Sequence, residues 1–255
     1  MNPIQIDWAV TPAAIWRQRR ELLRPVFEID PIRLADLQGV DRQKEALVRN
    51  TERFLEGRPA NNALLWGAKG TGKSSLIKAL LNEYFEQGLR IVEVDKNDLV
   101  WLPEIIDEIR ESDKRFIIYS DDLSFERGES SYKALKSVIE GSIERPPANV
   151  IIYATSNRRH LMPESMEDNE RARVVQTEIH HAEAVEEQIS LSDRFGLWLS
   201  FYPFNQDEYL QIVDGYFPDY AGDRAELHRR AIQFALAKGG RSGRAALQFY
   251  RSYVE

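Results

Sequence analysis

The chain has 255 residues, of which 43% are hydrophobic and 29% charged, and its formal net charge is −7 at pH 7. This length suits one large domain, or a medium domain with a small appendage. The acidity does not favour nucleic acid as the default partner, although a local basic patch could still serve one. The absence of cysteine excludes disulfides and thiolate metal sites, and four scattered histidines do not indicate zinc.

The N-terminus predicts neither a secretory leader nor a membrane anchor. It lacks a basic start followed by an apolar run, and no window of the chain reaches the roughly 18 apolar residues that a membrane helix needs. We therefore expect a cytoplasmic protein with no membrane partner.

The first 60 residues favour helical and irregular structure. Residues 1–33 are expected to form an N-terminal helical extension, in which Trp8 and Trp16, eight positions apart, would share one side of a helix. An amphipathic run over 41–55 predicts a further helix that leads into the main fold.

Apolar, β-favouring runs then alternate with helical patterns, which is typical of a parallel α/β sheet. Each helical segment is long enough for a right-handed crossover between neighbouring parallel strands. The fold class is therefore α/β, with a five-stranded parallel sheet. The strands are expected at 62–66, 89–95, 115–122, 149–157 and 197–203, and the crossover helices at 74–87, 102–111 and 131–144.

No strand pattern returns after residue 204. Helical segments near 205–216, 223–237 and 242–254 predict a small helical lid. The domain organisation expected is thus an α/β nucleotide-binding domain over 34–203 and a lid over 204–255. The highly charged stretch 158–190 is too polar for the core and is expected to leave the surface as an excursion.

The stretch "GAKGTGKS" predicts a phosphate-binding loop between a strand and a helix. Glycines let backbone N–H groups turn toward phosphates, and the following helix presents the positive end of its dipole. Lys73 is suited to reach the β- and γ-phosphates, and the Ser74 hydroxyl is suited to hold Mg²⁺. The nucleotide-binding residues expected here are Gly67, Ala68, Lys69, Gly70, Thr71, Gly72, Lys73, Ser74 and Ser75.

The stretch "FIIYSDDL" predicts a buried strand that ends in two carboxylates at the carboxyl edge of the sheet. Asp121 is the candidate for holding Mg²⁺ together with Ser74. Asp122 is the candidate for orienting or polarising the attacking water, with Glu126 as a reserve base. The structural alternative is that Asp122 only caps the turn after the strand.

At these residues the chain resembles the AAA+ ATPases. "LADLQGVDRQKEAL" is similar to the segment that contacts adenine in that superfamily, which implies roles for Gly39 and Val40. "YATSN" resembles the strand that ends in the polar sensor 1 residue, here Asn157. The structural alternative for Asn157 is that it only terminates the strand.

Two arginines complete the resemblance. "SLSDRFGLWLSFYP" is similar to the segment that carries the arginine finger, which implies that Arg194 acts on the nucleotide of a neighbouring subunit. "GGRSGRAALQF" resembles the sensor 2 segment of the lid, with Arg244 as its arginine and Arg241 as a rival. For Arg194 the structural alternative is a salt bridge with Asp193 or a nearby glutamate, and Arg244 has a similar alternative.

Over residues 30–255 the chain also resembles a bacterial family of AAA+-type ATPases of unknown function, and its finger segment is similar to those of helicase loaders and replication initiators. One position departs from the superfamily, because the usual acidic pair is Asp-Glu and this chain has Asp121-Asp122. The shorter side chain makes hydrolysis a weaker expectation than binding.

The leading functional hypothesis is an ATPase that binds ATP and Mg²⁺, assembles as a homo-oligomer or ring, and remodels or loads an unidentified macromolecular partner. The alternative is a slowly hydrolysing, ATP-gated adaptor that binds a protein or single-stranded DNA. A small-molecule kinase ranks last, because it gives no reason for sensor-like residues and a lid.

Overall fold

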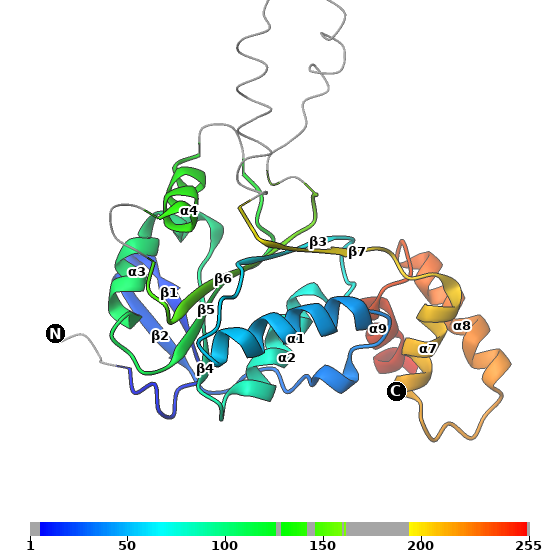
Figure 1. Cartoon of the computed structure of the whole chain (residues 1–255). Helices are drawn as coiled ribbons and strands as arrows, with labels where there is room; N and C mark the ends of the chain where they lie inside the picture. The colour runs from blue at the N-terminus through cyan, green and yellow to red at the C-terminus, as the bar shows by residue number, and fades with distance from the viewer. Residues whose placement is uncertain (1–5, 126–128, 142–145, 160, 162–193, 254–255) are drawn as a thin grey trace, which may run out of the picture.

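The structure is a computed structural model that describes residues 6–125, 129–141, 146–159, 161 and 194–253 (Figure 1). A twisted sheet forms its centre, helices lie on both faces, and a group of C-terminal helices sits at one end (Figure 1). The predicted charged excursion over 158–190 falls outside the described residues except for positions 158, 159 and 161, and Glu126 and Asp193 fall outside them as well.

The sheet has seven strands rather than the five predicted, in the order β2-β1-β4-β5-β6-β3-β7. The five predicted strands are confirmed, and all of them run parallel to their neighbours. They are β3 (Ala63–Gly67), β4 (Leu89–Glu93), β5 (Arg115–Ser120), β6 (Val150–Ser156) and β7 (Leu197–Phe201).

The two additional strands correct the expectation of a helical N-terminal extension. Strands β1 (Ala13–Arg17) and β2 (Leu22–Val26) form an antiparallel hairpin, closed by the 3₁₀ turn η1 (Gln18–Arg20). Strand β1 pairs in parallel with β4 and so extends the sheet. The helical periodicity was misleading because both tryptophans pack on β structure. Trp8 is partly buried and meets Phe116 of β5 edge to face, and the buried Trp16 lies in β1.

Two hydrophobic cores lie on opposite faces of the sheet, because successive side chains of a strand alternate between faces. In β3, Leu65 joins one core and Leu64 the other. Helices α1 (Asp41–Leu55) and α2 (Lys73–Tyr84) cover the first face, and η3 (Lys96–Trp101), α3 (Leu102–Ile109) and α4 (Ser130–Glu140) cover the second.

The C-terminal helices α7 (Gln206–Tyr216), α8 (Arg224–Ala237) and α9 (Gly243–Tyr253) lie where three helices were predicted. Asn205 caps α7 by accepting from the Glu208 amide, while the Glu208 carboxylate accepts from the Asn205 amide. Their apolar faces share the core of α1 and α2, with Tyr209 and Phe249 among the buried residues. The boundary of a separate lid domain at residue 204 stays a prediction.

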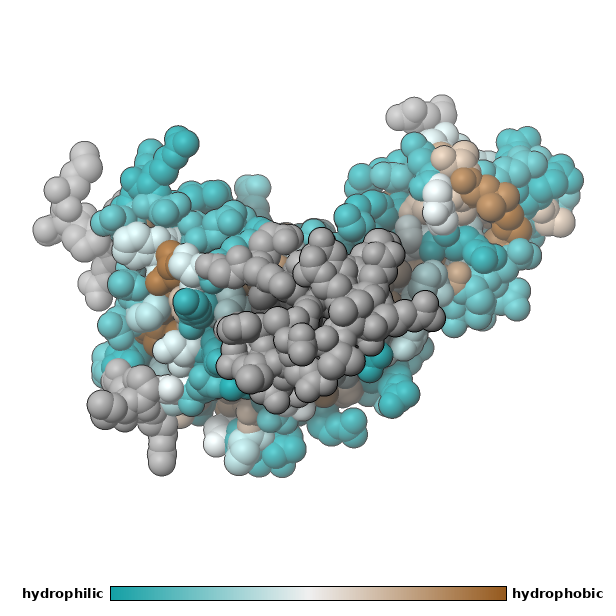
Figure 2. All heavy atoms as spheres, turned by 90° about the horizontal axis from the view of Figure 1, so that it is seen from above, coloured by the Kyte–Doolittle hydropathy of each residue, from teal (hydrophilic) through white to brown (hydrophobic). Residues whose placement is uncertain are grey.

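Among the described residues, no helix combines the length and the apolar character that crossing a bilayer requires. Viewed from above, the surface is mainly hydrophilic, with small hydrophobic areas both on the side of the sheet and on the side of the C-terminal helices (Figure 2).

Candidate functional site: a phosphate loop and an acidic strand end

The phosphate loop connects the end of β3 to the start of α2, as predicted. Its glycines have positive φ values, 130° at Gly67, 74° at Gly70 and 99° at Gly72, which other residues rarely adopt. A Cβ on Gly67 would lie 2.0 Å from the carbonyl oxygen of Phe201. No side chain caps the first turn of α2, so its amide groups are available to an anion.

Lys73, the first residue of α2, is 7% exposed and folds back over the loop. Its ammonium group donates to the carbonyl oxygens of Gly67 (2.9 Å) and Ala68 (2.7 Å) and lies 3.3 Å from Oδ1 of Asn157. Burial lowers the pKa of Lys73, and the charges of Asp121 and Asp122 oppose that shift. The loop therefore holds a positive charge beside two carboxylates.

Asp121 follows β5 and meets Ser74 across the site. The Ser74 hydroxyl donates to Oδ1 of Asp121 at 2.7 Å, and the Thr155 hydroxyl donates to the same oxygen at 2.5 Å. Burial raises the pKa of Asp121, but the hydrogen bonds from Thr155 and Ser74 outweigh it, so the pKa lies below its usual range. Asp121 is thus held ionised.

Asp122 has a φ of 52°, the left-handed region that residues other than glycine seldom occupy. Its backbone amide donates to the Thr155 hydroxyl at 2.9 Å, and its carboxylate accepts a hydrogen bond from the Asn157 side-chain amide. Lys73, Asn157 and Asp122 are therefore linked in one chain of contacts. Such backbone strain is common at functional sites, where the surrounding structure holds it in place.

The donor set fits a magnesium nucleotide. Mg²⁺ in phosphate-binding sites takes one or two protein oxygen ligands together with phosphate oxygens and water, and Ser74 with Asp121 supplies such a pair. The described residues contain no cluster of three or more metal-ligating side chains.

The segment expected to contact the base lies beside this loop. Gly39 has a φ of 73°, and a Cβ there would be 3.0 Å from the ring of Phe204, at the junction of β7 and α7. Val40 is 3% exposed, and a Cβ on Gly72 would lie 3.9 Å from Leu37. Binding of the base at Gly39 and Val40 stays a prediction.

The start of α9 packs directly on the phosphate loop. The Gly243 amide donates to the Gly70 carbonyl oxygen at 2.9 Å, and a Cβ on Gly70 would lie 3.3 Å from Cβ of Arg244. The charge of Arg244 contributes to the lowered pKa of Lys73, as expected of a cation near that ammonium group. The structure therefore places Arg244 at the phosphate loop.

Arg194 lies just before β7 and forms an ion pair with Glu140 of α4. Its side chain is 29% exposed. This pair corresponds to the salt-bridge alternative, with the glutamate coming from α4. The structure thus brings Asn157, Asp122 and Arg244 to the phosphate loop of the same chain and gives Arg194 a partner on α4.

Thr155 is the site residue that sequence reasoning missed. It is 1% exposed, and its hydroxyl bridges the Asp121 carboxylate and the Asp122 amide, while its carbonyl oxygen accepts from Leu123 at 2.7 Å. The feature of the sequence that could have identified Thr155 is its position two residues before Asn157, at the end of a predicted strand. Using that feature requires knowing that β5 and β6 are neighbours with Ser120 opposite Ala154, which puts Thr155 beside Asp121.

Comparison with known proteins gives one family match that spans nearly the whole chain. A family model described as "Protein of unknown function (DUF815)" matches residues 9–255. The replication factor C large subunits of Staphylothermus marinus and Ignicoccus hospitalis are 38% and 33% identical over 74 and 75 residues, 29% of this chain. The matched segments cover only 17% and 15% of those proteins, so the chain spans a small part of these curated relatives.

Solved structures with a similar fold include AAA+ ATPases. The RuvB Holliday junction branch migration motor of Thermotoga maritima has a TM-score of 0.50 at 15% identity, covering 87% of this chain and 72% of that chain. The Aeropyrum pernix ORC1 protein, solved in complex with DNA, has a TM-score of 0.56 at 15% identity, covering 83% and 58%. At such identities the likeness shows the fold alone.

Proposed function

The chain belongs to the family described as a protein of unknown function (DUF815), and from that family, its AAA+ fold and its phosphate loop we propose that it binds Mg-ATP and hydrolyses it to remodel or load a macromolecular partner. The observation that carries the proposal is the hydrogen-bonded network at one sheet edge. Lys73, Ser74 and Asp121 lie there with the Asp122–Asn157 pair.

Each side chain of this network has a role in the proposed hydrolysis. Lys73 and the amides of the loop bind the phosphates, and Ser74 with Asp121 holds Mg²⁺, which would neutralise charge on the phosphate oxygens. Asn157 orients the attacking water, and Asp122 accepts its proton as the water oxygen bonds to the γ-phosphorus and ADP leaves. The φ of Asp122 and its contact with Asn157 compensate for the shorter carboxylate by fixing its position.

The contact between α9 and the phosphate loop supports a conversion of nucleotide state into lid movement. A change at Gly70 reaches Gly243 through one backbone hydrogen bond, and Arg244 would bind the phosphates from the lid side. We further propose a cytoplasmic homo-oligomer in which Arg194 reaches the nucleotide of a neighbouring subunit. In that assembly the Arg194–Glu140 pair must exchange for the contact with the γ-phosphate.

The names of the similar proteins support a macromolecular partner, since RuvB is described as a branch migration motor and ORC1 was solved with DNA. The second candidate function, a slowly hydrolysing adaptor gated by ATP, has its own support. Asp122 stands where the superfamily has glutamate, and Arg194 is already paired within its own chain. Both features predict slow turnover until a partner binds.

The deciding experiment measures Mg-ATP turnover per chain against protein concentration, for the wild type and for Arg194→Ala and Lys73→Ala. Turnover that rises with concentration, and is lost in Arg194→Ala while nucleotide still binds, supports an oligomeric ATPase. Turnover near zero with ATP still raising the melting temperature supports the adaptor. If ATP neither binds nor stabilises the wild type, both candidates fail.

A further inference from the structure

The β1–β2 hairpin concentrates positive charge in an acidic chain. Within the eight residues 17–24 there are four arginines and a single acid, Glu21, whereas the whole chain carries −7. No lysine occurs before Lys44. The arginines, which we call the hairpin arginines, are Arg17, Arg19, Arg20 and Arg24, and all four are exposed.

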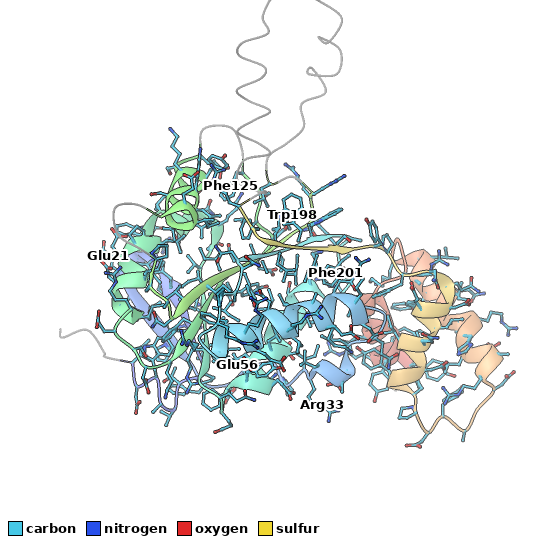
Figure 3. All side chains as sticks on the ribbon, in the orientation of Figure 1. Glu21, Arg33, Glu56, Phe125, Trp198 and Phe201 are labelled. Atoms are coloured by element: carbon cyan, nitrogen blue, oxygen red, sulfur yellow. The ribbon has the colours of Figure 1, made fainter. Side chains whose placement is uncertain are left out.

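The hairpin tip extends beyond the sheet that anchors it. Strand β1 pairs with β4 only through Ala13–Ile15, and Ile15 is opposite Glu93, the last residue of β4. Arg17 and the turn that follows lie past that point, held only by pairing with β2. In Figure 3, Glu21 marks this tip at the opposite end of the molecule from the lid.

Buried apolar residues fix the hairpin in place. Trp16 and Leu23, paired across the two strands, are 4% and 5% exposed, and Trp16 packs at 6.4 Å from Trp101. The turn closes through the Glu21 amide, which donates to the Gln18 carbonyl oxygen at 3.1 Å. The arginines are therefore displayed from a rigid base, which lowers the entropic cost of binding through them.

The hairpin arginines have no carboxylate partner in an ion pair within the part of the chain that the structure describes. Arg17 is close enough to Glu93 to favour the ionised form of that carboxylate, although burial raises the pKa of Glu93 overall. A local positive field of this kind attracts polyanions even when the net charge of the protein is negative.

We propose that the hairpin arginines bind the phosphate backbone of a nucleic acid. Phosphates recur along a nucleic-acid strand about every 3.4 Å of axis, so one strand can meet several of these side chains at once. The guanidinium fork binds the oxygens of both phosphates and carboxylates bidentately, so it is the regular recurrence of phosphates along a strand that favours a nucleic acid over an acidic protein. None of the hairpin arginines is among the residues assigned to nucleotide binding.

The test measures binding of fluorescein-labelled 30-nucleotide single-stranded and duplex DNA by anisotropy across a salt series, without nucleotide. The hairpin variant is Arg19→Gln/Arg20→Gln/Arg24→Gln. The matched control is Arg49→Gln/Arg53→Gln/Arg251→Gln, which removes three exposed arginines of α1 and α9. Melting temperatures confirm that both variants fold.

We expect the hairpin variant to bind at least about tenfold more weakly than the wild type. Its slope of log K against log salt should fall by about 2 to 3, because each phosphate contact contributes about 0.7 to 0.9. The control variant should stay within about twofold of the wild type. The same difference is expected in a Lys73→Ala background, so a failure of ATP binding leaves this result unchanged.

The proposal is overturned if the wild type binds no DNA, or if the hairpin variant and the control weaken binding equally. It is also overturned if poly-glutamate of equal charge competes as well as DNA does, because the surface would then fit an acidic protein instead.

Discussion

The backbone amide of Gly243 donates a hydrogen bond to the backbone carbonyl of Gly70, at 2.9 Å, so helix α9 of the lid begins directly on the phosphate loop. The loop and the lid are 173 positions apart in sequence, and no side chain takes part in this bond. In the proposed function, a movement of α9 would therefore be transmitted to the phosphate loop through the main chain.

Gly70→Ala should weaken nucleotide binding by about tenfold or more. The φ of 74° disfavours alanine by about 1–2 kcal/mol, and the new Cβ would lie 3.0 Å from Cβ of Ser242 and 3.0 Å from its hydroxyl, pushing α9 off the loop. Gly239→Ala is the control, because its φ is 84° and a Cβ there meets nothing within 4 Å. Both variants should lose stability, and only Gly70→Ala should lose affinity in a fluorescent-nucleotide titration; equal affinities would refute the coupling.

Thr155→Val should slow turnover and weaken the effect of Mg²⁺ on nucleotide affinity, while Thr155→Ser restores both. Valine keeps the shape but removes the donor to Asp121 and leaves the Asp122 amide without its acceptor, at a cost of about 1–3 kcal/mol in the free energy of unfolding. If Thr155 had a purely structural role, Thr155→Val would lower the stability of the protein but would leave the magnesium dependence of nucleotide affinity unchanged.

The pH dependence of Thr155→Val follows from the lowered pKa of Asp121. A carboxyl whose folded pKa is lowered stabilises the fold above its unfolded pKa, and this contribution is lost as the pH falls through the folded value. Removing the Thr155 donor raises the pKa of Asp121. The acidic limb of the kcat profile should therefore move to higher pH in Thr155→Val, and an unchanged limb would show that Asp121 does not control it.

Asp122→Asn should retain nucleotide affinity and lose turnover by about a hundredfold or more, the usual contribution of a general base. The amide oxygen can still accept from Asn157, and asparagine tolerates a φ of 52° as well as aspartate does. Single-turnover hydrolysis with radiolabelled ATP measures the chemical step. Turnover equal to that of the wild type would assign the water to another residue.

Mixing Arg194→Ala with Lys73→Ala chains should restore turnover that neither variant has alone. In a mixed oligomer, an intact phosphate loop of one chain can meet an intact Arg194 of its neighbour. Glu140→Gln alone should turn over ATP faster than the wild type, because it releases Arg194 from its ion pair. If mixing restores nothing although gel filtration shows mixed oligomers, Arg194 acts within its own chain or only supports α4.

Local sequence patterns were enough to predict the parallel strands, the phosphate loop and the C-terminal helices. Those features depend on short stretches of sequence, such as the apolar run that ends in Gly67 or the acids that follow β5. Hydrophobic periodicity and the spacing of glycines therefore predict them without knowledge of tertiary contacts. The sequence also predicted that Ser74, Asp121 and Asn157 share one sheet edge, since parallel strands end together.

The N-terminal hairpin and several contacts of the site residues depend on tertiary structure. The β1–β2 hairpin escaped sequence reasoning because β2 contains Pro25 and because β1 joins the sheet by pairing with β4, more than 70 residues away. The register of β5 against β6 selected Thr155 as the partner of both aspartates. Packing of α9 placed Arg244 at the phosphate loop, and α4 supplied Glu140 to Arg194. Each of these depends on non-local pairing, whose free energy no short stretch of sequence contains.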